Sequence, residues 1–300
     1  MQYYMNKVGL EEMTGFVSLT LKRSLELLRE HGKRQTRWGF LVAIDLTDLE
    51  YFGEKDGFVH NSVKRKGTRY QKATVHRYAS LSIIAPRFKL TLAMLPVREE
   101  EKLEDTVDRL LTRVEKLVRI RCIVLDKGFY NTAVLNKIEE HALHYLVPVV
   151  KRDELELLYW QSRASGRWVW KYVMNKTDKE RRKQVPVYFY ELYPSEYQGF
   201  ITNRCMKTDT GERLLEIYDQ RWNIENGYKE AEDFLIKTSS KNPVYRLFLY
   251  MISHLLVNLQ NIVRETRYRV RYYEMHQIIE HVLAGKTGEQ RISKRLIVVL

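Results

Sequence analysis

Cysteine is scarce in this sequence of 300 residues, with only Cys122 and Cys205 present. The two lie far apart, and neither has the spacing of a metal ligand. This argues against a disulfide scaffold or a zinc site, and it suits a reducing compartment.

Long uninterrupted apolar runs are also missing. The N-terminus, MQYYMNKVGLEEM, lacks the apolar core of a signal peptide. The longest apolar stretch, residues 247–263, is interrupted by Ser253, His254 and Asn258, which indicates a buried helix and not a membrane span. We therefore expect a cytoplasmic protein with no membrane partner.

Acidic residues are absent from Gly57 to Arg98, although the segment is rich in lysine and arginine. The whole chain has a net charge of +13, which favours a polyanionic partner, most often nucleic acid. Within the segment, VKRKGTRYQK predicts a glycine-containing loop that could bind a phosphate backbone. The alternative is a solvated basic loop. The basic residues on which the first reading depends are Lys64, Arg65, Lys66 and Arg69.

Strand and helix patterns alternate through residues 38–151. After a helical pattern over 11–31, an apolar run from Trp38 predicts a strand, and residues 78–97 predict two strands joined near Pro86. A helix, a strand, a second helix and another strand follow. This order predicts an α/β fold with a mixed sheet flanked by helices.

Residues 152–206 break the alternation. WVWKYVM and PVYFYELY alternate aromatic and polar residues, which predicts a β-rich insertion whose tryptophans mostly form its own core. Long helices are expected at about 209–236 and 243–266, with a last one near 272–284. We expect an N-terminal helical segment (1–37), the first part of an α/β core (38–151), the insertion (152–206) and C-terminal helices (207–300).

Two aspartates follow apolar strand patterns. Asp45 and Asp126 are each expected to end a strand, and functional groups gather at the carboxyl ends of strands. If the strands are neighbours, a divalent metal such as Mg²⁺ would relieve the repulsion between the carboxylates. The alternative for Asp126 is a helix cap or a solvated strand end. Asp48 is expected to face solvent.

The segment YDQRWNIENGYKEAEDF places Tyr218, Arg221, Glu225, Lys229 and Glu232 on one face of a predicted helix. Simple i,i+4 salt pairs on a solvated face would explain the same spacing. Trp222 is expected to pack beneath this helix.

Together these motifs resemble those of the DDE transposases of bacterial and archaeal insertion sequences. Tyr218-x2-Arg221-x3-Glu225 is similar to the signature of that family, and AIDLTD and VLDKGFY resemble its two aspartate motifs. The likeness covers about residues 38–262, in the order of the family. It is strongest to the subgroup with a β-rich insertion.

The resemblance implies an RNase H-like fold and a transposase that hydrolyses phosphodiesters and transfers strands at insertion-sequence ends. It implies two Mg²⁺ ions (Mn²⁺ is possible) held by Asp45, Asp126 and Glu225. Double-stranded DNA, as element ends and target, is the implied partner of a homodimer associated with the nucleoid. The residues expected to contact DNA or phosphate are Tyr218, Arg221, Lys229, Lys64, Arg65, Lys66 and Arg69.

Two departures from the family pattern keep alternatives open. Glu232 stands where the family motif has a lysine, and Lys229 is a possible substitute. Only 37 residues precede Trp38, so we expect a copy shortened at its N-terminus. The alternatives are a catalytically impaired or repurposed transposase that acts as a DNA-binding protein, or a nuclease of the same fold.

Overall fold

The computed structural model describes residues 7–31, 39–66, 69–194, 196–204 and 211–265. Side chains are described throughout these ranges except at 63–71. The helix expected near 272–284 lies outside the described residues.

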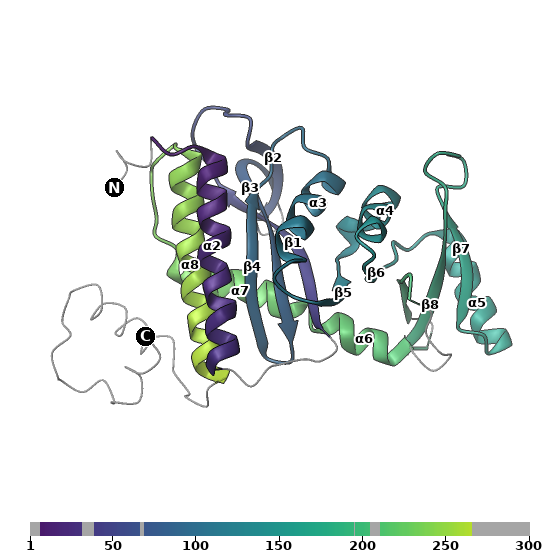
Figure 1. Ribbon diagram of the computed structural model, residues 1–300. Coiled ribbons are helices and arrows are strands. Elements are labelled where there is room, and N and C mark those ends of the chain that lie inside the picture. The colour runs from purple at the N-terminus through teal and green to yellow at the C-terminus, as the bar shows by residue number, and fades with distance from the viewer. Residues whose placement is uncertain (1–6, 32–38, 67–68, 195, 205–210, 266–300) are drawn as a thin grey trace.

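A nine-stranded mixed sheet forms the centre of the described chain (Figure 1). Its order is β2-β3-β1-β5-β6-β9-β8-β7, and β4 also pairs with β3. The strands are β1 (Phe40–Glu50), β2 (Val59–Lys66), β3 (Arg69–Ala85), β4 (Phe88–Pro96), β5 (Ile120–Val124), β6 (Tyr145–Pro148), β7 (Val169–Met174), β8 (Lys183–Tyr193) and β9 (Glu196–Ile201).

Five neighbouring strands of the core, β4, β3, β1, β5 and β6, have mixed directions. β1 is antiparallel to β3, and β3 is antiparallel to β4, whereas β5 runs parallel to β1 and β6 parallel to β5. The spatial order β4-β3-β1-β5-β6 is that of an RNase H-like fold, so the predicted fold class is confirmed. The expected hairpin within 78–97 is also confirmed, with its turn at Pro86 and Arg87.

Helices cover both faces of this sheet (Figure 1). In the ribbon view α2 and α8 lie side by side next to β4, and the insertion lies at the opposite end of the sheet. The helices are α2 (Leu10–His31), α3 (Leu103–Val114), α4 (Thr132–Glu140), α5 (Asp153–Ser165), α6 (Gly211–Asp219), α7 (Trp222–Phe234) and α8 (Pro243–Glu265), with a short 3₁₀ helix, η1 (Lys127–Phe129). None of the helices described is both long enough and apolar enough to cross a membrane.

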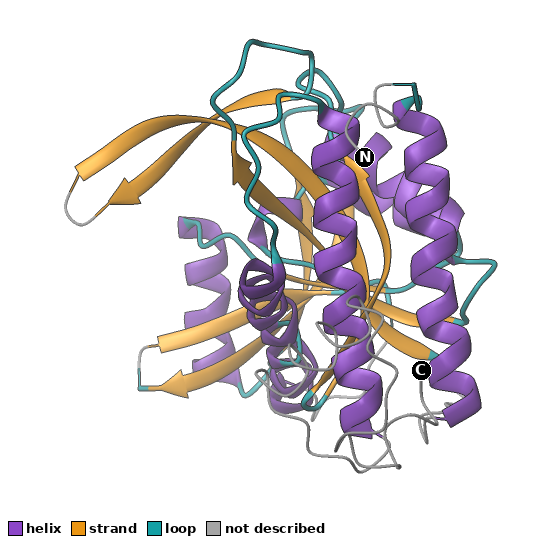
Figure 2. Cartoon of the chain, turned by 90° about the vertical axis from the view of Figure 1, so that its left-hand side faces the viewer, coloured by secondary structure: helices purple, strands orange, loops and turns teal. Residues whose placement is uncertain are grey.

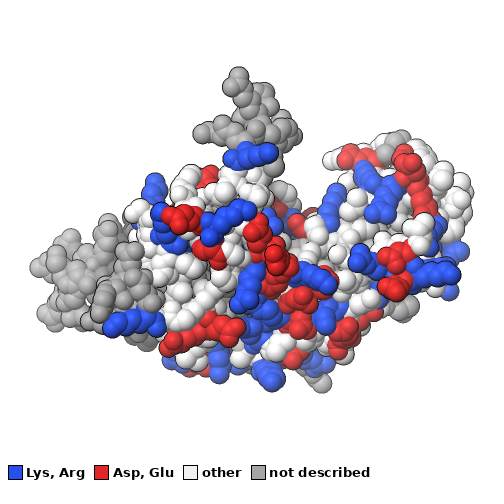
Figure 3. Space-filling view, turned by 90° about the horizontal axis from the view of Figure 1, so that it is seen from above, with Lys and Arg blue, Asp and Glu red and all other residues white. Residues whose placement is uncertain are grey.

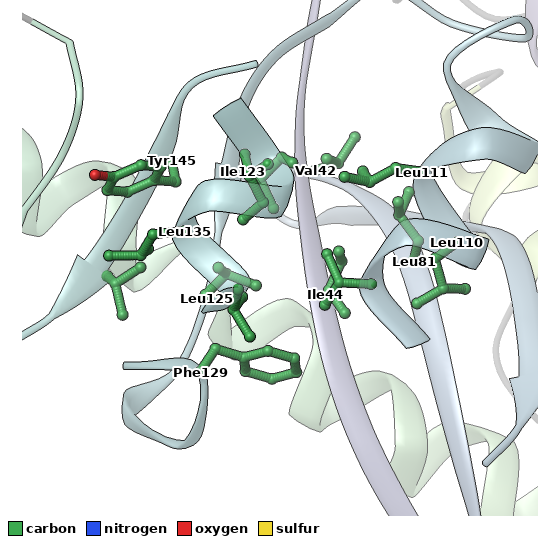
Figure 4. Packing of buried hydrophobic residues seen from close by; sticks show 14 of the residues in the cluster. Val42, Ile44, Leu81, Leu110, Leu111, Ile123, Leu125, Phe129, Leu135 and Tyr145 are labelled. Atoms are coloured by element: carbon green, nitrogen blue, oxygen red, sulfur yellow. The ribbon is translucent and has the colours of Figure 1, made fainter. Parts of the chain in front are cut away.

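The main core lies between the sheet and helices α3 and α4 (Figure 4). Val42 and Ile44 of β1 point towards Leu110 and Leu111 of α3, all of them fully buried. Because side chains alternate along a strand, the residues between them face the other side of the sheet.

The basic segment is a β-hairpin, which corrects the expectation of a loop. β2 and the first half of β3 pair in register from Val59↔His76 to Lys66↔Arg69. Figure 2 shows this two-stranded ribbon projecting from the sheet. Lys64, Arg65 and Lys66 therefore lie on one arm and Arg69 on the other.

The region after β6 has the predicted β-rich insertion. β7, β8 and β9 form an antiparallel meander, and β9 joins the main sheet by pairing with β6. Helix α5 was not anticipated. Trp168 and Trp170 pack against the core as expected, whereas Trp160 is 42% exposed.

The single helix expected at about 209–236 is two helices, α6 and α7, so that prediction was wrong. The chain turns at Gln220 and Arg221, where the amide of Ile224 bonds to the carbonyl of Arg221 at 2.8 Å. The Asn223 side-chain amide donates to the carbonyl of Ala85 at 2.8 Å, which fixes the start of α7 on the β3–β4 hairpin. A contact this distant in sequence outweighs the local helical preference.

Candidate active site

We expected Asp45 to end its strand, but it lies inside β1. The second half of β1 continues to pair with β3, whereas the parallel pairing with β5 stops at Ala43 and Val124. Asp45 and Asp126 each stand two residues beyond that last pair. The two aspartates therefore lie at the same level of neighbouring parallel strands.

The face on which Asp45 lies follows from strand alternation. Leu41 and Ala43 pack against Ile224 of α7. Asp45 has the same parity along β1, so its side chain faces the α6–α7 side of the sheet. It is 9% exposed, and its Oδ1 accepts the amide of Leu46 at 2.9 Å.

Asp126 follows β5 and caps η1. Its Oδ1 accepts the amide of Gly128 at 2.8 Å. A Cβ added at Gly128 would lie 3.0 Å from that same oxygen, so glycine allows the close turn. The capping alternative is thus realised by one oxygen of Asp126.

Arg221 joins Asp45 to Glu225. Its Nη2 donates to Oε1 of Glu225 at 2.6 Å, and its Nη1 lies 3.7 Å from Oδ2 of Asp45. Arg221 is only 8% exposed, and its buried Nε has no hydrogen-bond partner among the described atoms. The i,i+4 salt pair that the sequence allowed is therefore present, but it is buried against a third charge.

The electrostatics of Asp45 show how close the acidic groups are. Burial is the main cause that raises the pKa of Asp45 from 3.8 to about 6. The Leu46 amide and Arg221 lower this pKa, whereas the charges of Asp126 and Glu225 raise it. The charges of the other two predicted carboxylates therefore act on Asp45.

Tyr218, at the end of α6, completes the group around Arg221. The guanidinium carbon of Arg221 lies 5.5 Å from the centre of the Tyr218 ring. Burial raises the pKa of Tyr218, Arg221 lowers it, and Asp126 and Glu225 raise it. Tyr218, Arg221 and Glu225 thus surround one site despite the break in the helix.

The other predicted site residues lie further out. Lys229 and Glu232 are exposed on α7. Lys64 and its basic neighbours lie on the β2–β3 hairpin, where side-chain positions fall outside the description. Trp222 does not pack beneath the helix: it is 54% exposed, because it is the first residue of α7 and points away from the sheet side occupied by Ile224.

Sequence reasoning missed Ser80 and Tyr228. Ser80 is the cross-strand partner of Asp45, and its Oγ lies 2.7 Å from the Tyr228 hydroxyl. A serine inside the apolar run YASLSII was the available signal. Asp48 does not face solvent freely, since Arg77 on β3 donates two hydrogen bonds to it, at 2.8 and 3.0 Å.

The carboxylates do not form a ready metal cage. Within the described ranges, no three acidic, histidine or cysteine side chains lie close enough to hold an ion together. Glu225 is engaged by Arg221 instead. Carboxylate oxygens are nonetheless the donors that Mg²⁺ prefers. The pKa of Asp45 is raised mainly by burial and further by the charges of Asp126 and Glu225, and a nearby cation would favour the ionised carboxylate.

The face of the molecule that is seen from above has mixed charge. Figure 3 shows lysine and arginine interspersed with aspartate and glutamate over one face of the molecule. On this face the net charge of +13 is thus not gathered into one uniform patch.

Comparison with known proteins identifies the family. The family model described as the transposase DDE domain matches residues 41–257, and the chain belongs to this family. Its function is thus of the transposase or nuclease type, in a family that uses divalent metal ions. A comparison with curated proteins found no match.

Among solved structures, the chain is similar to a substituted endonuclease V of Ciona intestinalis in complex with a 23mer DNA containing an inosine followed by a ribo-adenosine. The sequences are 9% identical, with a TM-score of 0.32, over 80% of this chain and 97% of that one.

Proposed function

We propose that this protein is a DNA transposase that hydrolyses phosphodiester bonds and transfers strands at the ends of an insertion sequence. The proposal is supported by two observations: Asp45 and Asp126 lie at the same level of neighbouring strands, and Arg221 joins Asp45 to Glu225. Three carboxylates from two strands and a helix serve no evident purpose in a protein that only binds DNA.

Asp45, Asp126 and Glu225 would hold two divalent ions, most simply Mg²⁺. Such ions, when bound, supply Lewis acidity for the attacking and leaving oxygens of a phosphodiester. Burial of Asp45 keeps water from screening its charge, and the Leu46 amide fixes one of its oxygens. The fixed capping bond of Asp126 orients the second carboxylate in the same way.

Arg221 and Tyr218 would hold the DNA phosphate. A guanidinium binds phosphate oxygens in a bidentate manner, and Nε of Arg221 is a buried donor without a described partner. Engagement of phosphate by Arg221 would also free Glu225 from its present salt bridge. DNA binding and completion of the carboxylate site are then coupled.

The basic hairpin would contact the DNA backbone away from the reacting bond. Lys64, Arg65, Lys66 and Arg69 lie on its two arms, and Lys229 lies one helical turn beyond Glu225. Each phosphate that they neutralise releases counterions and makes binding depend on salt. Cleavage of paired element ends would require two copies of the chain on DNA.

The test is a cleavage and joining assay on duplex DNA that carries the sequences flanking the gene on both sides. With Mg²⁺ we expect nicks at the element ends and products joined to a target plasmid. Asp126→Asn should lose both, whereas the control Asp105→Asn, an exposed aspartate on α3, should retain both. Nicking without joined products would indicate a nuclease of the same fold.

A second candidate, a DNA-binding protein without catalysis, is favoured by two observations. Arg221 occupies the space between Asp45 and Glu225, and Glu232 is a carboxylate at the motif position where the family has a lysine. Metal-independent binding to the same duplex with no nicking would establish this candidate. Restoration of nicking by Glu232→Lys would show that this residue caused the loss.

A further inference from the structure

A partly buried hydroxyl pair connects the strand pair that bears Asp45 to the helix that bears Glu225. Ser80 on β3 is the register partner of Asp45 on β1 and is 1% exposed. Its Oγ lies 2.7 Å from the hydroxyl of Tyr228. Tyr228 follows Glu225 by one turn of α7, so the bond connects the surroundings of two of the three carboxylates.

A second hydrogen bond secures the other side of Glu225. The Asn223 side-chain amide donates to the carbonyl of Ala85 at the end of β3. Residues 223 and 228 thus attach α7 to the same strand on both sides of Glu225. Ile224 packs into the apolar cluster between them, so the first two turns of α7 rest firmly on the sheet.

The Tyr228 side chain is itself firmly held. Its ring contacts the ring of His254 on α8, with centroids 5.9 Å apart. Burial raises the pKa of Tyr228 well above its ordinary value, and the nearby charge of Asp45 raises it further. The phenol therefore stays protonated and can keep its bond with Ser80 across the physiological pH range.

We infer that the Ser80–Tyr228 pair is a positioning device that sets the separation of Asp45 from Glu225 and thereby the affinity of the carboxylate site for a divalent cation. The inference rests on the proposed function, because it assumes that these carboxylates bind metal. Neither hydroxyl is assigned a contact with substrate. Ligand carboxylates need placement within about 0.5 Å, and partners behind the ligands typically change metal affinity by roughly 10–100-fold.

The experiment is a direct titration of the purified protein with Mn²⁺, followed by electron paramagnetic resonance of the free ion. Tyr228→Phe removes one hydroxyl and keeps the ring, and Ser80→Ala removes the other. We expect each variant to bind Mn²⁺ about tenfold more weakly than the wild type. The double variant should be little weaker than either single one, since both remove the same bond.

Tyr159→Phe is the matched control. The Tyr159 hydroxyl donates to Oε1 of Glu191 at 3.0 Å in the insertion, so the control also loses one partly buried hydrogen bond. It should bind Mn²⁺ like the wild type, even where its unfolding temperature falls as much as that of Tyr228→Phe. If Tyr228→Phe does not fold, Ser80→Ala carries the test.

Two outcomes overturn the inference, and they can be told apart. If the wild type binds Mn²⁺ and Tyr228→Phe and Ser80→Ala bind it equally well, the positioning role is wrong while the proposed function stands. If the wild type binds no Mn²⁺, even with DNA present, the metal site of the proposed function fails and the inference fails with it.

Discussion

Replacement of Asp45 by asparagine should stabilise this protein at neutral pH in the absence of metal. The pKa of Asp45 rises from 3.8 to about 6 in the folded chain, mainly because the carboxylate is buried. A rise of this size corresponds to about 3 kcal/mol of free energy lost by ionising the folded protein. Asparagine keeps an oxygen for the Leu46 amide and carries no charge.

The pH window follows from the sign of that change. Below about pH 3, Asp45 is protonated in both states and costs nothing. As pH rises from 3.8 through about 6, the unfolded chain ionises first, so stability is progressively lost. Asp45→Asn should therefore match the wild type at about pH 3. Above pH 7 it should exceed the wild type by up to about 3 kcal/mol, or roughly 5 °C in unfolding temperature.

The assay is thermal unfolding followed by circular dichroism at about pH 3 and pH 8, in the presence of a chelator. Asp48→Asn is the control on the same strand, because it should have the opposite sign. Although burial raises the pKa of Asp48, the hydrogen bonds and charge of Arg77 lower it overall. The neutral variant should thus be less stable at pH 8. A destabilised Asp45→Asn at pH 8, or a difference independent of pH, would refute the reasoning.

Three further results are expected. A methyl group added by Gly227→Ala would overlap the buried Lys89 side chain, so the free energy of unfolding in denaturant titrations should fall by about 1–3 kcal/mol. Adding Lys89→Ala to this variant should recover part of that loss, and strictly additive losses would contradict this packing. Trp222→Ala should change the free energy of unfolding by less than about 0.5 kcal/mol, since the indole is 54% exposed. It should weaken duplex binding at least about fivefold in fluorescence anisotropy, and an unchanged Kd would exclude Trp222 from the DNA interface. Neutralising Lys64 and Arg65 together should reduce the slope of log K against log salt by about 2, whereas an unchanged slope would place the hairpin away from DNA.

Local patterns in the sequence were enough to predict much of the core. The apolar runs before Asp45 and Asp126 predicted β1 and β5, and the expected hairpin over 78–97 is present. Apolar residues with a period of 2 or 3.6 indicate a strand or a helix and its buried face, whatever the rest of the chain does. The order of these elements then predicted the mixed sheet.

Several of the errors involve contacts between residues far apart in the chain. The end of β1 was placed at Asp45 because its pairing with β3 beyond that point is not visible locally. The break before α7 depends on the bond from Asn223 to Ala85, 138 positions away. Trp222 was expected to be buried on apolar character alone, but the direction of α7 exposes it.

The sequence by itself determined which residues are candidates for the chemistry: acidic groups after two apolar strands, and a tyrosine, an arginine and a glutamate at fixed spacing. Tertiary structure alone decided that Asp45 and Asp126 lie at the same level of neighbouring strands, that Arg221 lies between Asp45 and Glu225, and that a hydrogen bond joins Ser80 to Tyr228. The physical reason is that the periodicity of apolar residues predicts the buried face of one element at a time. The placement of one charge beside another depends on strand register and helix docking, which are set by packing across the whole core.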